Sequence, residues 1–197
     1  DEFNLTFVAM TPNLYHDAIT SLKSGGVILY PSDTIWGLGC DVRNDASIEK
    51  LLQIKQRPAE KGLIVLISKI EQLNEYVEEV PEIAWDLVDF AEDPLTVIYP
   101  KGKNVSAHLL GPDGSIAIRL VKDEFCKGLI YRYQRGIVST SANISGEASP
   151  LNFESIAGSI KEQVDYILKN PNPTKGNNKP SKIVKLGLGG DYSLIRG

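Results

Sequence analysis

Short apolar runs and helical patterns interleave along the chain. Residues 27–30 and 63–67 are uninterrupted apolar runs, a pattern typical of strands covered on both faces. Between them, the apolar positions from Ile48 to Leu52 keep helical spacing, and Asp45 stands where a helix cap is expected. Strands and helices therefore follow one another from the first third of the chain onward.

The same signals predict the remaining elements. Helices are expected at 16–24, from a capping box at 68–71, and at 81–91, 125–133 and 153–160. Strands are expected at 95–99, 115–121, 136–138, 164–168, 183–186 and 192–195. Because the two kinds do not alternate strictly and no internal repeat occurs, we predict a single α/β domain, core about 12–197, with a twisted mixed β-sheet flanked by helices.

Two segments between these elements stand out. Residues 31–41 follow a buried strand, and we interpret them as a polar turn that Gly37 and Gly39 shape, which alone is more often structural than functional. Residues 170–180 form the one long segment of low order. At that length inside a compact domain, we interpret it as a mobile functional loop, with simple disorder as the alternative.

Two cations follow the helix that begins near Asp45. Lys55 continues the apolar stripe of that helix, and Arg57 lies two residues further on, where Pro58 disfavours continued helix. Two cations leaving a helix together suit a polyphosphate. For Lys55 alone, a snorkelling side chain at a helix end is the better interpretation.

Polar side chains also occur inside and just after predicted strands. Arg119 lies in a strand that otherwise reads Ile-Ala-Ile, so it needs an anionic partner or an open edge. Ser139, Ser141 and Asn143 follow another strand, at the end where α/β sheets bind ligands. For any one of these three, a turn with side chain to backbone hydrogen bonds is the simpler interpretation.

Composition excludes several classes of protein. The 42 % apolar content is that of a soluble globular protein, and no apolar run is long enough to span a bilayer. Two cysteines and no signal segment favour the cytoplasm. Two histidines make no metal site, and neither a P-loop nor a Rossmann fingerprint is complete. A hydrolase using Cys40 stays open, although such cysteines are commonly packing residues.

The charge is unevenly distributed. Residues 71–93 contain nine acidic residues and no Lys or Arg, whereas residues 101–143 have a local balance of +4. Residues 169–185 contain five lysines and no acidic residue. The acidic stretch is best interpreted as solvated helix surface, and the other two regions leave room for a basic cleft, although the net charge of −4 argues against a general nucleic-acid binder.

Five motifs occur between about residue 25 and the end of the chain. They read Pro31-Ser32-Asp33-Thr34-x-x-Gly37-Leu38-Gly39, Lys55-x-Arg57-Pro58-x-x-Lys61-Gly62-Leu63, Ser115-Ile116-Ala117-Ile118-Arg119, Ser139-Thr140-Ser141-Ala142-Asn143-x-Ser145-Gly146 and Pro180-Ser181-x-Ile183-Val184. In order and rough spacing, the five together resemble the YrdC-like threonylcarbamoyl-adenylate synthases in their short, single-domain form.

The resemblance implies a YrdC-like fold with an open cleft, and an enzyme that makes L-threonylcarbamoyl-adenylate and pyrophosphate from L-threonine, bicarbonate and ATP. A partner enzyme would then transfer the threonylcarbamoyl group to adenosine 37 of tRNA. ATP would come with Mg²⁺ bound through phosphate oxygens and water, without metal ligands from the protein.

The resemblance also implies roles for individual residues. The implied catalytic and ATP-binding tetrad is Lys55, Arg57, Ser141 and Asn143, joined at the ATP site by Lys61 and Ser139. The implied threonine site is Thr34, Arg119 and Ser181, with Arg119 suited to the amino acid's carboxylate.

The chain departs from the family pattern at a few positions. It has Ser32 where threonine is commoner and Trp36 where tyrosine is usual. It reads Glu92-Asp93-Pro94 where Pro-Gly-Pro is frequent, and Lys182 where a small hydroxyl residue is common.

Two alternative functions use the same resemblance. One is an RNA-binding module of the same fold without synthase activity, in which binding would be mostly phosphate-driven. The other is the carbamoyl-transfer role of similar domains in larger maturation proteins, although no accessory domain accompanies the present sequence. A synthase could also make a weak contact with RNA. No membrane partner is expected.

Overall fold

A mixed sheet of nine strands organises the molecule in a computed structural model that describes residues 14–56, 63–171 and 180–196. This confirms the predicted mixed α/β fold. The strands are β1 (Ile28–Tyr30), β2 (Gly37–Asp41), β3 (Ile64–Ile67), β4 (Leu95–Tyr99), β5 (Ile116–Leu120), β6 (Ile137–Ser141), β7 (Tyr166–Ile167), β8 (Lys182–Leu186) and β9 (Tyr192–Arg196).

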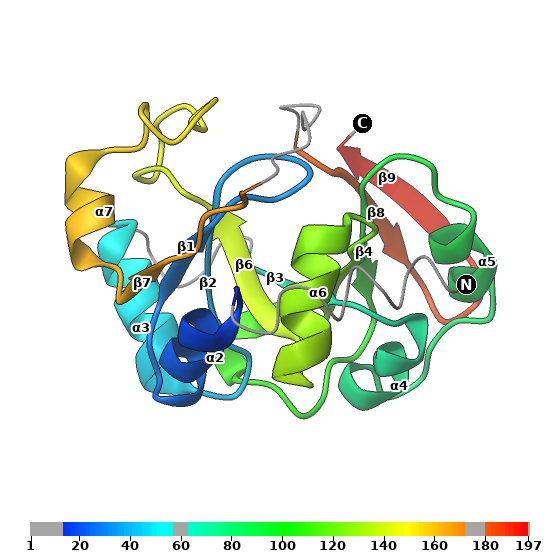
Figure 1. Cartoon of the computed structure of the whole chain (residues 1–197). Helices are drawn as coiled ribbons and strands as arrows, with labels where there is room; N and C mark the ends of the chain where they lie inside the picture. Colours follow the sequence, from blue (N-terminus) through cyan, green and yellow to red (C-terminus); the bar gives the residue numbers. More distant parts are fainter. Residues whose placement is uncertain (1–13, 57–62, 172–179, 197) are drawn as a thin grey trace, which may run out of the picture.

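The strand order β7-β1-β2-β6-β3-β5-β4-β8-β9 brings together segments that are far apart in sequence (Figure 1). β1 and β7, β3 and β5, and β4 and β8 pair in parallel. The other neighbouring strands pair antiparallel. β2 therefore lies between β1 and β6. The predicted strand at 136–138 extends to Ser141, so Ser139 and Ser141 lie within β6 rather than after it.

Helices cover both faces of the sheet. They are α2 (His16–Lys23), α3 (Asp45–Ile54), α4 (Leu73–Tyr76), α5 (Ile83–Asp89), α6 (Glu124–Tyr133) and α7 (Gly158–Gln163), with short 3₁₀ turns η1 (Ile70–Gln72) and η2 (Ala107–Leu109). α2 and α6 contact each other and lie in front of the sheet in Figure 1. Their apolar residues form one core cluster with one face of the strands, while α3, α4, α5 and α7 contribute to a larger cluster.

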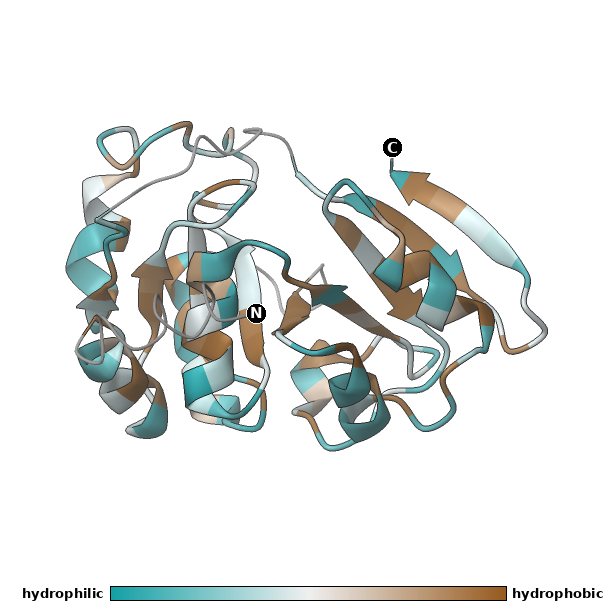
Figure 2. Cartoon of the chain, turned by 45° about the vertical axis from the view of Figure 1, so that its right-hand side comes forward, coloured by the Kyte–Doolittle hydropathy of each residue, from teal (hydrophilic) through white to brown (hydrophobic). Residues whose placement is uncertain are grey.

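The hydropathy of each element follows this layering. Strands are mostly apolar, whereas helices carry apolar and polar residues side by side (Figure 2). Leu29 and Tyr30 are adjacent in β1 and both fully buried, yet they belong to different core clusters. Successive strand residues point to opposite faces, so a strand without polar alternation is expected where both faces are covered.

The prediction of a turn over residues 31–41 is wrong for its second half. Gly37–Asp41 is strand β2, hydrogen-bonded to β1 and β6. The glycines therefore do not shape a turn; they leave room for a neighbour. A Cβ atom at Gly39 would lie 2.9 Å from Cε1 of Tyr30 and 3.0 Å from the carbonyl oxygen of Val138.

Three local predictions also need correction. Asn44, not Asp45, caps α3, because its side chain accepts a hydrogen bond from the Ser47 amide at 3.0 Å. Gln72, not Glu71, closes the turn after β3, since its Oε1 accepts from the amides of Ser68 and Lys69. The helix predicted at 153–160 is displaced to α7, Gly158–Gln163.

Among the described residues, no helix has the length and apolar character needed to cross a membrane.

The close packing at Gly39 predicts that Gly39→Ala lowers the free energy of unfolding by about 1–3 kcal/mol, because backbone and a buried ring must move. Gly158→Ala is the matched control, since nothing lies within 4 Å of an added Cβ there. We expect it to be neutral or stabilising by about 0.5 kcal/mol. Urea unfolding of both variants measures the difference, and equal stabilities would contradict the packing argument.

Candidate active site

A cavity of about 360 Å³ opens on one face of the sheet. Its walls come from both ends of the chain and from the middle. They are Ser32, Thr34, Ile35, Gly37, Ile64, Thr96, Ile98, Ala117, Arg119, Ser139, Thr140, Ser141, Ser149, Pro180, Ser181, Ile183 and Arg196. The lining is thus rich in hydroxyl groups and holds two arginines.

Strand register explains why these residues share a face. Arg119 in β5 pairs with Thr96 in β4, and Ile64 in β3 pairs with Ser139 in β6. Directly paired residues project to the same side of a sheet, and so do residues two apart along a strand. The cavity side therefore collects alternate residues of four neighbouring strands, while residues such as Ile118 enter the core on the other side.

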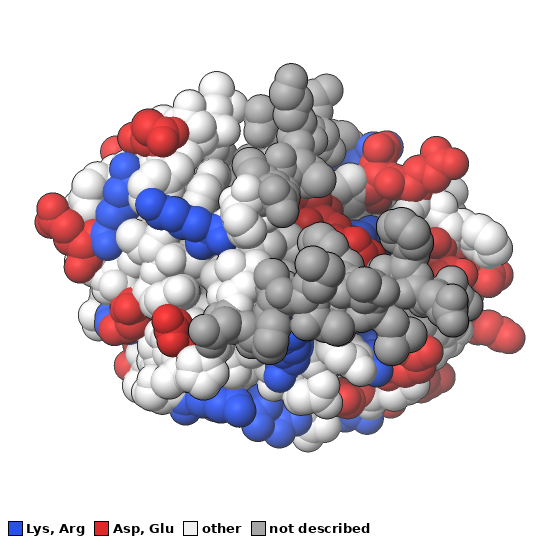
Figure 3. Space-filling model, in the orientation of Figure 1, with Lys and Arg blue, Asp and Glu red and all other residues white. Residues whose placement is uncertain are grey.

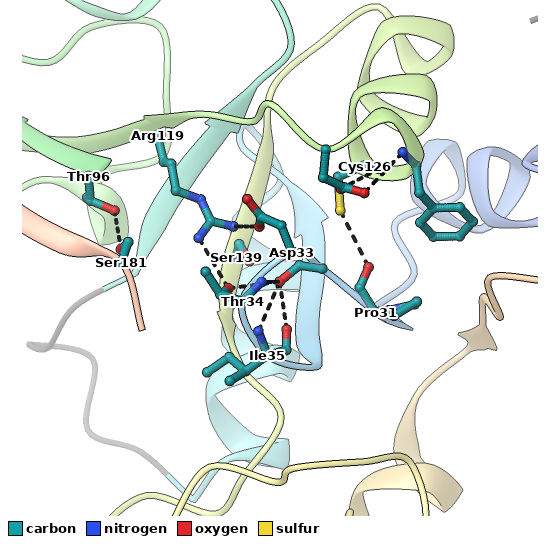
Figure 4. A network of polar contacts seen from close by, with 12 residues as sticks. Pro31, Asp33, Thr34, Ile35, Thr96, Arg119, Cys126, Ser139 and Ser181 are labelled. Carbon is teal, nitrogen blue, oxygen red and sulfur yellow. Dashed lines mark hydrogen bonds and ion pairs between the residues drawn. The ribbon is translucent and has the colours of Figure 1, made fainter. Parts of the chain in front are cut away.

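Arg119 lies on the floor of the cavity with only 4 % of its surface exposed. Its Nη2 is 3.3 Å from Oδ1 of Asp33, and its Nη1 donates to Oγ1 of Thr34 at 3.2 Å (Figure 4). The prediction that this arginine needs an anionic partner is confirmed. Within the described part of the chain its Nε is buried and has no hydrogen-bond partner.

Asp33 is the anionic partner and is itself mostly buried. Burial raises the pKa of its carboxyl group, and the positive charge of Arg119 opposes that rise. Ser32 holds the turn that presents Asp33 and Thr34. Its Oγ donates to the carbonyl of Ile35 at 2.7 Å and accepts from the Thr34 amide at 3.2 Å (Figure 4).

Ser181 and Thr96 close the opposite wall. Their hydroxyl oxygens are 2.7 Å apart, and both residues are almost fully buried (Figure 4). Arg196 at the end of β9 donates to the carbonyl oxygen of Ser181 from Nε at 3.1 Å and from Nη2 at 2.8 Å. β9 thereby fixes the segment that enters β8.

Lys55 is buried beside the cavity, with 1 % of its surface exposed. Its Nζ donates to the backbone carbonyls of Ser141 and Asn143. The lysine therefore ties the end of α3 to the loop after β6, and it does not snorkel to solvent. This is a second buried cation, with two backbone carbonyls among its partners.

Asn143 points its amide into the same loop. Its Nδ2 donates to the carbonyls of Ile144 and Glu147, at 3.0 and 2.8 Å. Its Oδ1 is buried and lacks a hydrogen-bond partner among the residues described. Its amide therefore holds the loop after β6 through two backbone carbonyls.

The structure brings together five of the nine predicted site residues along the cavity wall, namely Thr34, Arg119, Ser139, Ser141 and Ser181. Lys55 and Asn143 lie in the adjoining loop and do not line it. Arg57 and Lys61, together with most of the loop predicted at 170–180, lie outside the described residues.

Sequence reasoning missed Thr96, Ser149 and Arg196. The sequence does contain a signal for Arg196. This arginine directly follows two apolar residues of a predicted strand, Leu194 and Ile195, just as Arg119 follows Ile-Ala-Ile. Thr96 gave no signal, since threonine is an ordinary strand residue.

The two charged departures from the family pattern contact each other. Nζ of Lys182 lies 2.7 Å from Oδ2 of Asp93, with both side chains more than half exposed. The Lys182 amide also donates to the carbonyl of Pro94 at 3.0 Å. The aspartate and the lysine thus compensate each other at the rim, and neither charge is left facing a phosphate site alone.

The described residues contain no group of three or more His, Cys, Asp or Glu side chains arranged to hold a metal ion. The hydroxyl and guanidinium groups of the cavity wall suit anions instead.

Comparison with known proteins gives a consistent result. The Sua5/YciO/YrdC family model, described as telomere recombination, matches residues 20–197. A threonylcarbamoyl-AMP synthase of Pseudoalteromonas translucida is 38 % identical over 169 residues, covering 84 % of this chain and 89 % of the relative. The synthase of Idiomarina loihiensis is 35 % identical over 171 residues, covering 85 % and 91 %.

Solved structures agree. Sua5 of P. abyssi complexed with L-threonine superposes with a TM-score of 0.79 at 27 % identity, over 87 % of this chain and 50 % of that one. The present chain therefore spans about half of that protein. E. coli YciO matches in fold, with a TM-score of 0.78 at 24 % identity over 93 % of this chain and 88 % of that one. The chain belongs to the Sua5/YciO/YrdC family.

Proposed function

We propose that the protein is an L-threonylcarbamoyladenylate synthase, which makes threonylcarbamoyl-AMP and pyrophosphate from L-threonine, bicarbonate and ATP. The curated relatives at 33–38 % identity carry this activity in their names. The observation that carries the proposal is the buried Arg119, which lines a hydroxyl-rich cavity and pairs with Asp33 and Thr34 from the first of the family motifs.

The chemistry needs no covalent nucleophile from the protein. The threonine amine takes up the carboxyl carbon of bicarbonate with loss of water, and an oxygen of the resulting carbamate attacks the α-phosphorus of ATP. The bond to the β,γ-phosphates breaks, and pyrophosphate leaves. The protein's part is to hold both reactants in line and to stabilise the charge that develops.

Arg119 and Thr34 would bind the amino acid. A guanidinium binds a carboxylate through two parallel hydrogen bonds, and Asp33 already occupies one edge of Arg119 at 3.3 Å. A substrate carboxylate would replace or share the present partners of the two Nη atoms, Asp33 and Thr34. Ser181, held by Thr96 and Arg196, would contact the threonine from the opposite wall.

The phosphates would bind at the end of the cavity beside Ser139 and Ser141. Arg57 and Lys61 would supply positive charge there, as the motif resemblance implies. Lys55 would act by fixing the loop that presents Ser141 and Asn143, because its ammonium is bonded to that loop's carbonyls. Its charge still contributes to the potential at the phosphates.

Mg²⁺ would enter as part of the Mg·ATP substrate. A hydrated Mg²⁺ bound through phosphate oxygens fits a cavity wall of hydroxyls and arginines, since the ion keeps several waters and needs few protein ligands. The product would pass in the cytoplasm to a tRNA threonylcarbamoyl transferase.

RNA binding is the weaker alternative. The net charge is −4, and Figure 3 shows Asp and Glu interspersed with Lys and Arg on the face in view. Phosphate-driven binding needs several cations that act together on one surface.

The first prediction from this assignment concerns substrates. Purified protein with Mg·ATP should release pyrophosphate only when L-threonine and bicarbonate are both present, because the carbamate is the nucleophile. A coupled pyrophosphate assay with single omissions measures this, and L-serine in place of threonine tests specificity. Release that is unchanged without threonine would refute the assignment.

A second prediction concerns Arg119. Arg119→Lys keeps the charge but loses the planar fork, so kcat/KM for threonine should fall about ten- to hundredfold. Arg43→Lys is the matched control, because Arg43 is exposed and its side chain donates to the Asn104 carbonyl at 3.1 Å, away from the cavity lining. Steady-state kinetics at saturating ATP decides, and equal kcat/KM in the two variants would remove Arg119 from the threonine site.

A third prediction separates the scaffold role of Lys55 from surface charge. Lys55→Met should lower the free energy of unfolding by about 2–4 kcal/mol, because two buried carbonyls lose a charged donor. Lys50→Met, which breaks a half-exposed ion pair with Asp165, should cost less than about 1 kcal/mol. Denaturant unfolding of both measures this; a Lys55 variant as stable as wild type would contradict the scaffold role.

A further inference from the structure

The ring of Tyr30 lies across β2 underneath the cavity. Tyr30 is fully buried and does not line the cavity. Its backbone pairs with Gly37, whose added Cβ would lie 3.2 Å from Cζ of the ring. An added Cβ at Gly39 would lie 2.9 Å from Cε1. Because Gly37 and Gly39 have no side chains, the ring of Tyr30 can pack against β2 and extend toward β6.

The hydroxyl at the end of that ring reaches a cavity residue. Oη of Tyr30 is 2.5 Å from Oγ of Ser139, which lies two strands away on β6 and lines the cavity. Among the described residues, Ser139 is the one hydrogen-bond partner of this hydroxyl. Tyr30 therefore donates its hydrogen to Ser139, because a buried O–H without an acceptor is costly.

Burial raises the pKa of Tyr30 well above its ordinary value, so the phenol stays protonated at physiological pH. Because Oγ of Ser139 accepts the hydrogen bond from Tyr30, the hydroxyl hydrogen of Ser139 points away from Tyr30. The open direction is the cavity. A phenylalanine would fill the space under β2 equally well, so packing alone gives no reason for the hydroxyl.

Resting on the proposed function, we propose that Tyr30 is a positioning residue that fixes the Ser139 hydroxyl as a hydrogen-bond donor toward an anionic group of the bound substrates. Tyr30 touches no substrate. It acts through Ser139, and the two glycines of β2 make that reach possible. The Gly-x-Gly pattern thus has a functional purpose, although neither glycine contacts a ligand through a side chain.

The test is a double-mutant cycle with Tyr30→Phe, Ser139→Ala and the double variant. The KM for ATP and the KM for L-threonine are measured separately by pyrophosphate release. Tyr30→Phe should raise one of the two KM values roughly two- to tenfold, the value of one hydrogen bond, with kcat changed less. Ser139→Ala should raise the same KM, and the double variant should match Ser139→Ala, because Tyr30 has no route to substrate except through Ser139.

Tyr76→Phe is the matched control. Tyr76 is also fully buried, and its hydroxyl accepts a hydrogen bond from the Gly136 amide at 2.8 Å, away from the cavity wall. That variant should lose stability in denaturant unfolding while keeping both KM values. The control shows what the loss of a buried tyrosine hydroxyl does when only structure depends on it.

Three outcomes would overturn the inference. They are wild-type KM values in Tyr30→Phe, full multiplication of the two effects in the double variant, and unchanged KM values in folded Ser139→Ala. The last holds even if Tyr30→Phe does not fold. A wild-type protein without threonine-dependent pyrophosphate release would instead refute the proposed function, so the two failures are distinguishable.

Discussion

The burial of a guanidinium in the face of a β-sheet is the constraint on which the site depends. Arg119 projects from a central strand with 4 % exposure, and an unpaired charge there would cost several kcal/mol. Asp33, in the turn between β1 and β2, offsets that cost through its ion pair with Arg119. The turn must therefore keep its place over the sheet, and Ser32 holds it with hydrogen bonds to three neighbouring groups. The position of Thr34 in the cavity follows from the need to neutralise Arg119.

The second buried cation, Lys55, has partners of a different kind. Nζ of Lys55 donates to the backbone carbonyls of Ser141, at the end of β6, and of Asn143, in the loop that follows. Arg119 is thus oriented by a carboxylate and a hydroxyl group from the turn before β2, whereas Lys55 links the end of α3 to the end of β6. One cation is suited to binding and the other to shaping the loop that binds.

How much the sequence could predict depended on whether the cause of a feature was local. Apolar runs identified β3 and β4 almost to the residue, and the charge argument placed Arg119 beside an anion. β2 was missed because glycines are depleted in strands, and the reason for these two is a contact with the ring of Tyr30. The cap of α3 was displaced by one residue because Asn44 and Asp45 are both good caps. Ser149 reaches the cavity only through tertiary packing, which no local pattern encodes, whereas Arg196 follows apolar strand residues and could have been found as Arg119 was.

The cavity wall begins at Ser32 and ends at Arg196, and its strands pair in an order unrelated to their order in the chain. Arg196 closes the wall by binding the carbonyl of Ser181, so the site lacks one side until β9 has paired with β8. A chain still emerging during synthesis would already contain Thr34 and Arg119 but could not yet enclose a ligand. Enclosure of a ligand therefore depends on the pairing of β9 with β8. A bound ligand would then stabilise the whole sheet. A substitution that disrupts β9 would weaken binding at Thr34, which lies far from β9 in the sequence.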